Sequence, residues 1–236
     1  MSTESFNFNA FIKDSVNTIV KPKEYFASLR TEGGLGEPVI KALLYGVVSG
    51  IFTFLWSLLK IGAVTGGLFG GAIGIMAFVW AIIGAVIGLF IGAVVTLIVS
   101  AICGGSTDYE ANARVTASLM VLMPVSAFLG FLTGLNFYLG FIIKLIINLY
   151  SLYLLYWALT GSLKAKESAS KILSIVLAAI LVIFLLIGLG TRKAANRFLD
   201  EFGVDTEKIE QSLQDVTDQM EEALEDLQDE IEDPGN

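Results

Sequence analysis

Three charged side chains stand close together at Asp108, Glu110 and Arg114. Glu110 precedes Arg114 by four residues, so on a helix the carboxylate meets the guanidinium in the favourable order. Two carboxylates this close could begin a metal site, but a third ligand is missing nearby and Arg114 balances one of them. We therefore predict a structural helix cap. The functional alternative is a docking site for a lipid headgroup or a protein partner.

A second polar pair, Lys144 and Asn148, lies inside an apolar stretch and shares one helix face. Lys144 falls about 10 Å into the stretch at a rise of 1.5 Å per residue. A lysine at mid-bilayer costs roughly 2.5–3.5 kcal/mol on insertion scales, unless it snorkels to the headgroups. We interpret the pair as a snorkelling lysine or a structural hydrogen bond. The alternative is a polar pathway for an ion or an anionic solute.

The sequence offers few residues of the types that catalyse reactions. The sequence contains no histidine, the commonest general base, and its single cysteine, Cys103, excludes an intrachain disulfide or a cysteine-based metal cluster. The paired acids have no base or nucleophile beside them, and the glycine-rich segments do not follow a strand as phosphate-binding loops do. We predict that the protein is not an enzyme and binds no metal or cofactor.

The composition indicates that most of the chain lies in a membrane rather than in water. The 236 residues are 55% hydrophobic and only 16% charged, with a mean hydropathy of +0.73, whereas soluble domains carry about 25% charged residues. Residues 61–107 contain no ionisable side chain except the thiol of Cys103. Since about 20 apolar residues cross a bilayer, we predict an all-α, polytopic membrane helix bundle.

We predict five transmembrane helices within a bundle at residues 39–190, at about 39–59, 74–102, 115–135, 138–160 and 169–190. As one helix, residues 61–102 would measure about 63 Å, twice the hydrocarbon thickness. The alternatives are a single long span after a glycine-rich membrane-dipping segment, or a hairpin of two spans. Turn-forming residues are absent near residue 82, which favours the single span. Pro124 is predicted to kink the third span.

Glycine recurs at every fourth residue in and beside the first two predicted spans. This spacing makes a groove on one helix face, where another backbone approaches closely. We therefore expect the grooves to pack the bundle or to support self-association. The glycines are Gly46, Gly50, Gly62, Gly66, Gly70, Gly74, Gly84, Gly88 and Gly92.

A lead-in at residues 1–38 precedes the bundle. Its residues 6–20 place Phe8, Phe11, Ile12, Val16 and Ile19 on one helical face, opposite Lys13, Asp14 and Asn17. This pattern fits an amphipathic helix lying on the membrane surface. It fits equally a helix packed against the end of the bundle.

The tail at residues 191–236 differs sharply in charge from the rest. Residues 200–236 carry 1 of the 15 Lys and Arg residues and 15 of the 23 Asp and Glu residues. A short heptad stripe of apolar residues runs from about 205 to 231. We interpret this segment as a solvated acidic helix, or alternatively as a helix for self-association or for docking a basic partner. An acidic tail without a basic stripe argues against nucleic-acid binding.

Lysine and arginine near the span ends predict the orientation. An arrangement of five spans with a cytoplasmic N-terminus places more of these Lys and Arg residues on the cytoplasmic side than an arrangement of six spans does. The first 38 residues lack the apolar core of a signal peptide, so we expect an internal segment to begin insertion. In a prokaryote the protein would lie in the cell (inner) membrane.

Two stretches, Ile19–Leu29 and Gly104–Val115 together with Pro124, resemble the Yip-domain family, the Ypt/Rab-interacting multi-pass membrane proteins and their prokaryotic relatives. Pro22, followed after two residues by Tyr25 and Phe26, is similar to that family's lead-in. The other stretch is the Gly-rich loop before the third span, its short polar start and its mid-span proline, which here are Gly104, Gly105, Asp108, Arg114 and Pro124. The resemblance covers about residues 10–190.

The resemblance implies a five-helix bundle with a cytoplasmic N-terminus and no enzymatic activity. The Asp-Leu-Tyr-Gly-Pro segment and Gly-Tyr pair of eukaryotic members are absent, so the chain looks more like a prokaryotic member. The leading hypothesis is a scaffold or adaptor that organises the lipid bilayer or recruits a protein partner. The alternative is a small transporter or channel that uses Lys144, Asn148 and the Pro124 kink.

Overall fold

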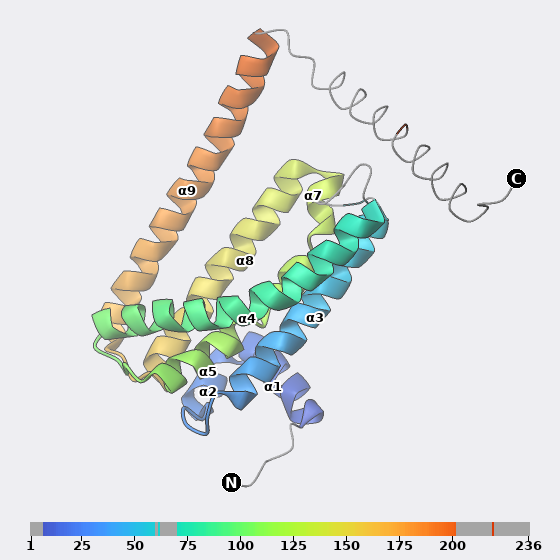
Figure 1. Cartoon of the computed structure of the whole chain (residues 1–236). Coiled ribbons are helices and arrows are strands. Elements are labelled where there is room, and N and C mark those ends of the chain that lie inside the picture. The colour runs from blue at the N-terminus through green and yellow to red at the C-terminus, as the bar shows by residue number, and fades with distance from the viewer. Residues whose placement is uncertain (1–6, 60, 62–69, 202–218, 220–236) are drawn as a thin grey trace, which may run out of the picture.

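The computed structural model describes residues 7–59, 61, 70–201 and 219, and it is built of helices alone over those residues (Figure 1). Five helical stretches are long and apolar enough to cross a membrane. This confirms the predicted polytopic all-α class. The stretches are Gly36–Leu58, Gly74–Ile102, Tyr109–Leu135, Phe137–Ser162 and Glu167–Gly188.

Two short helices of the lead-in come first, and the spans follow in chain order. The elements are α1 (Phe8–Val20), α2 (Pro22–Ser28), α3 (Gly36–Leu58), α4 (Gly70–Ile102), α5 (Tyr109–Leu119), α6 (Leu122–Phe128), α7 (Phe131–Leu135), α8 (Phe137–Trp157), the π-helical turn η1 (Ala158–Ser162) and α9 (Glu167–Glu201).

The helix α4 runs unbroken past residue 82, as one helix rather than a hairpin. The membrane-dipping segment expected before it lies largely outside the described residues, as does the acidic heptad stripe of the tail. Gly62 and Gly66 are also outside them.

Glycines join α3 to α4, but only some of the predicted ones are used. A Cβ added at Gly46 would lie 2.8 Å from the Ala85 Cβ, and one added at Gly50 would lie 3.1 Å from the Phe78 carbonyl oxygen. Gly74 and Gly92 also face close neighbours. At Gly84 and Gly88, in contrast, an added Cβ would meet nothing within 4 Å. The expected stripe therefore divides into a packed part and an open part.

The third span is broken rather than simply kinked. The helix α5 ends at Leu119 with Met120 as its cap, four residues before Pro124, and the chain resumes a helix at Leu122 as α6. Proline has no N–H, so the Met120 carbonyl cannot accept the ordinary bond from residue 124. It accepts instead from the Met123 N–H, at 2.9 Å. A second break follows between α6 and α7, at Leu129 and Gly130.

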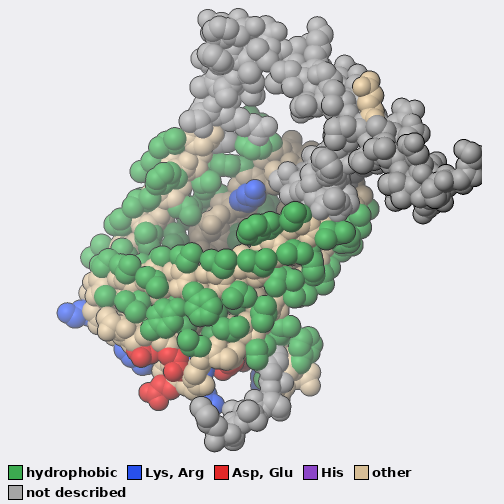
Figure 2. Space-filling view, viewed as in Figure 1, with side chains coloured by type: hydrophobic (Ala, Val, Ile, Leu, Met, Phe, Trp, Pro, Cys, Tyr) green, Lys and Arg blue, Asp and Glu red, His purple; other side chains and the backbone are tan. Residues whose placement is uncertain are grey.

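The buried core lies at the end of the bundle that α1 and α2 close. From that end α9 diverges from α3 and α4, and its main contacts are with α8 and η1 (Figure 1). Apolar side chains cover the visible sides of the spans (Figure 2), as expected for surfaces that face lipid. The core residues include Phe11, Tyr25, Phe26, Tyr45, Leu89, Val115, Leu154, Leu159 and Leu163.

Candidate functional site

The lead-in is anchored to the bundle through the motif in α2. Pro22 occupies the first helical position, where a missing N–H costs nothing. The Tyr25 hydroxyl lies 2.9 Å from the Ser118 Oγ of α5, in a buried hydrogen bond. Phe26 is fully buried, and its carbonyl accepts a hydrogen bond of 2.6 Å from the Ser162 hydroxyl. The motif thus holds α2 against both α5 and η1.

Replacing Tyr25 with phenylalanine removes only the hydroxyl of this anchor. We expect the free energy of unfolding to fall by about 1 kcal/mol, because the Ser118 hydroxyl retains its bond to the Arg114 carbonyl. Unfolding by SDS, followed by tryptophan fluorescence, measures the change. Ser28→Ala is the matched control, since Ser28 is exposed and its hydroxyl binds only backbone carbonyls of its own helix. A loss as small as that of the control would contradict the anchoring role.

Two loops meet beside this anchor. Gly104 has φ +71°, and a Cβ added at Gly105 would lie 2.9 Å from the Leu163 carbonyl oxygen. The Ser106 N–H donates to that carbonyl at 2.8 Å, and the Lys166 N–H donates to the Cys103 carbonyl at 3.0 Å. The glycine pair therefore permits the loop before α5 to bond directly to the loop before α9.

Asp108 begins α5 as its N-cap. Its carboxylate accepts from the Ala111 N–H at 2.8 Å, which satisfies one of the free donors of the first turn. Glu110 and Arg114 follow on α5, with the Arg114 Nε donating to the Glu110 Oε1 at 3.1 Å. The local pairing expected from the four-residue spacing is therefore present.

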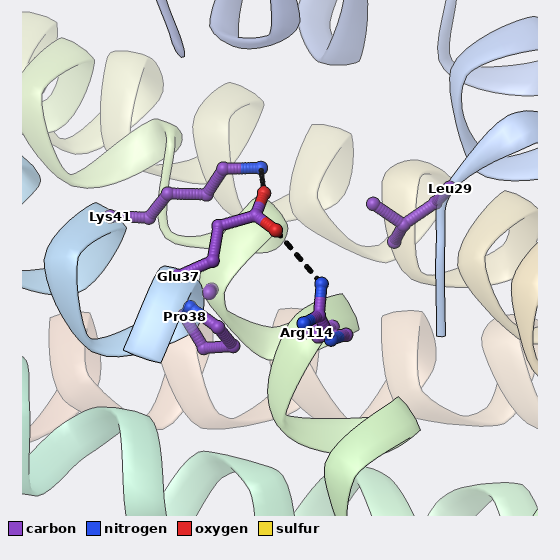
Figure 3. A pocket seen from close by; sticks show the side chains of 6 residues that line it. Leu29, Glu37, Pro38, Lys41 and Arg114 are labelled. Carbon is purple, nitrogen blue, oxygen red and sulfur yellow. Dashed lines mark hydrogen bonds and ion pairs between the residues drawn. The ribbon is translucent and has the colours of Figure 1, made fainter. Parts of the chain in front are cut away.

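Arg114 is also paired over a long distance in sequence. Its side chain is only 5% exposed, and its Nη1 lies 2.8 Å from the Glu37 Oε2 of α3 (Figure 3). Its Nη2 donates to the Gly34 carbonyl at 2.9 Å. The Gly34 N–H in turn donates to the Glu110 carboxylate. One guanidinium thus joins α5, α3 and the connection between α2 and α3.

A second buried cation extends this arrangement to α1. Lys41 is 5% exposed, and its Nζ lies 2.8 Å from the Glu37 Oε1 and 3.4 Å from the Asp14 Oδ2. Glu37 therefore bridges Lys41 and Arg114 with its two oxygens (Figure 3). We call Asp14, Glu37, Lys41, Glu110 and Arg114 the ion-pair network. Its three acids outnumber its two cations, so it does not favour an anionic ligand.

The network lies next to the most polar span segment. Every residue from Ala111 to Ser118 is buried. The Thr116 hydroxyl pairs with that of Thr96 at 3.0 Å, and the Asn112 Nδ2 donates to the Asp108 carbonyl at 2.7 Å. Buried polar groups need such partners. The lead-in and α3–α4 thus shield a segment that lipid alone would not accommodate.

The structure separates the second predicted polar pair from this site. Lys144 and Asn148 are exposed on α8, and the Asn148 Nδ2 donates to the Lys144 carbonyl at 2.8 Å. Within the described residues, no group of three or more His, Cys, Asp and Glu residues is placed to hold a metal ion.

Sequence reasoning did not connect Asp14, Glu37 and Lys41 to Arg114. The contact between Lys41 and Asp14 spans 27 residues and the contact between Arg114 and Glu37 spans 77. Only the pair of Glu37 and Lys41, four residues apart, has a local spacing. The available signal was Lys41 inside the predicted span 39–59, since a charge at membrane depth calls for a partner.

The comparisons with known proteins give one match. The family model described as the Yip1 domain matches residues 16–189, and this confirms the predicted resemblance. No curated protein and no solved structure matches the chain. The matched range contains α2, both loops and every member of the ion-pair network except Asp14.

Proposed function

The chain belongs to the Yip1 domain family, and from this premise we propose that it is a non-catalytic scaffold or adaptor of the membrane. It recruits a protein partner at the bundle end that carries α2, or it organises the surrounding bilayer. The acidic tail offers a second docking surface. The N-terminus faces the cytoplasm, and in a prokaryote the membrane is the inner one.

The observation that carries this proposal is the ion-pair network. It fixes the lead-in against the span ends through charged contacts that reach three helices and a loop. With its buried face anchored, α2 presents Lys23, Glu24 and Ala27 to the outside. Lys23 is itself held near the bundle, its Nζ 5.3 Å from the Trp157 ring centroid. A prearranged polar surface of this kind suits the binding of a partner.

A photocrosslinking residue at Ala27 of the full-length chain, in native membranes, tests the proposal. The matched control is the same residue at Ile183, which is 55% exposed on the lipid-facing part of α9. We expect discrete protein adducts from Ala27 that are absent from Ile183 and weaker in an Arg114→Ala background. Adducts with lipid alone at both positions would overturn the proposal.

Cysteine labelling tests the orientation separately. A single cysteine at Glu24 is introduced after Cys103→Ser. We expect it to react with a membrane-impermeant reagent only when the reagent has access to the cytoplasmic face of the membrane. Glu24 suits this test because its side chain is 75% exposed. Reaction in intact cells would place the lead-in on the other side.

The transporter hypothesis makes a different prediction for α8. We expect Lys144→Ala to change the free energy of unfolding by no more than about 0.5 kcal/mol, because the side chain is exposed. Solute and ion flux in proteoliposomes should be the same for this variant, for Asn148→Ala and for the unaltered chain. A selective loss of flux in Lys144→Ala would favour the transporter over the scaffold.

A further inference from the structure

The helix α1 has two different faces, and only one of them packs on the bundle. Phe11 and Thr18 are buried, and the Ser15 hydroxyl pairs with that of Tyr45 at 2.8 Å. The other face carries four apolar residues at a spacing of four. They form what we call the α1 stripe, and their exposed fractions are Phe8 56%, Ile12 46%, Val16 52% and Val20 67%.

The contacts of α1 determine its depth along the first span. Lys41 and Tyr45 are five and nine residues beyond Gly36, which is about 7.5 and 13.5 Å along α3. Both contact α1, through Asp14 and through Phe11, whose ring centroid is 5.1 Å from that of Tyr45. Therefore α1 lies beside the second and third turns of α3, not beyond its end.

This depth corresponds to the boundary between headgroups and hydrocarbon. Each headgroup layer is roughly 5–8 Å thick, and α3, whose first residue is Gly36, is long and apolar enough to cross a membrane. The same turns of α3 expose Ile40 and Leu43. Four exposed apolar side chains beside the first turns of a span are suited to contact with lipid.

Basic residues border the stripe. Lys13 follows Ile12 and is exposed, and Lys21, immediately after the helix, has a side chain 60% exposed that pairs with Glu24 at 3.8 Å. The one acid on the helix, Asp14, points to Lys41. An apolar stripe edged by lysines is the pattern of a helix that lies in an anionic membrane interface.

We propose that the α1 stripe inserts into the leaflet that α3 enters, with Lys13 and Lys21 on the phosphate groups of anionic lipids. The occupant of this surface is the bilayer, not a protein. The inference goes beyond the scaffold function and does not depend on it, because a transporter with the same α1 would bind lipid in the same way.

Fluorescence quenching of the full-length chain in nanodiscs tests the insertion. In a Cys103→Ser background, Val16→Cys carries a fluorophore on the α1 stripe, and Glu24→Cys carries it on α2 as the control. We expect lipid-borne nitroxide to quench the Val16 label and a water-soluble quencher to act on the Glu24 label. Equal exposure of both labels to the aqueous quencher would overturn the proposal.

Two further arms identify the occupant. With one chain per nanodisc, the Val16 label should stay protected from the water-soluble quencher. Protection that appears only with several chains per nanodisc would assign the α1 stripe to a second copy and overturn the proposal. Lys13→Gln should lower the ratio of lipid-nitroxide quenching to aqueous quenching of the Val16 label roughly fivefold in anionic nanodiscs. It should leave that ratio unchanged in zwitterionic ones. Equal effects in both lipids would overturn the role of the lysines.

Discussion

Replacing Arg114 with alanine is expected to lower the free energy of unfolding by about 2–4 kcal/mol, because it leaves Glu37, Glu110 and the Gly34 carbonyl without their shared cation. Removing one partner of a fully buried ion pair costs about 3–5 kcal/mol. The expected loss is somewhat smaller here, since the acids are 43% and 30% exposed and water can reach them. SDS unfolding followed by tryptophan fluorescence measures the difference.

Two other variants separate geometry from charge. Arg114→Lys keeps the charge but cannot reach three acceptors as a planar guanidinium does, so we expect it to recover only part of the loss. Lys166→Ala removes an exposed cation from the same end of the bundle and should change stability by less than about 0.5 kcal/mol. If Arg114→Ala were as stable as Lys166→Ala, the network would not hold the lead-in.

Adding a single methyl group at Gly46 is expected to cost about 1–3 kcal/mol. Its Cβ would lie 2.8 Å from the Ala85 Cβ and 3.1 Å from the Ala81 carbonyl oxygen. Neither neighbour is a flexible side chain, so α3 and α4 must move apart. The loss can be measured by the same SDS unfolding and by the rate of proteolysis in detergent.

Gly88→Ala is the matched comparison, because it makes the same chemical change on α4 where nothing lies within 4 Å. Alanine favours a helix over glycine by about 1 kcal/mol, so this variant should be as stable as the unaltered chain or slightly more stable. Gly84→Ala should behave likewise. A large destabilisation of Gly88→Ala in dilute micelles would show that the open glycines are packed after all.

The sequence was sufficient to predict the fold class and the number of spans, since both depend on local composition. An uncharged stretch such as residues 61–107 cannot be accommodated in water. The sequence did not reveal which glycines pack against a neighbouring helix, because the four-residue spacing of Gly84 and Gly88 is the same as that of Gly46 and Gly50. Only the position of a neighbouring helix distinguishes them.

Only part of the candidate site could likewise be predicted from the sequence. The pairing of Glu110 with Arg114 follows from helix geometry alone. The pairing of Arg114 with Glu37 depends on how α3 packs against α5, and Lys41 joins the network only through Glu37 and Asp14. The sequence could not decide between the two roles considered for the lead-in. In the structure one face of α1 packs on the bundle, and the other remains exposed.

The polarity of α5 has a consequence for biogenesis. A nascent segment containing Asn112, Arg114 and Ser118 would partition poorly from the translocon into lipid. Its partners on α1, α2, α3 and α4 are all synthesised earlier, so they can receive it as it emerges. We therefore expect the order of synthesis to matter, because Glu37 on α3 and Thr96 on α4 are already in place when Arg114 and Thr116 of α5 enter the membrane.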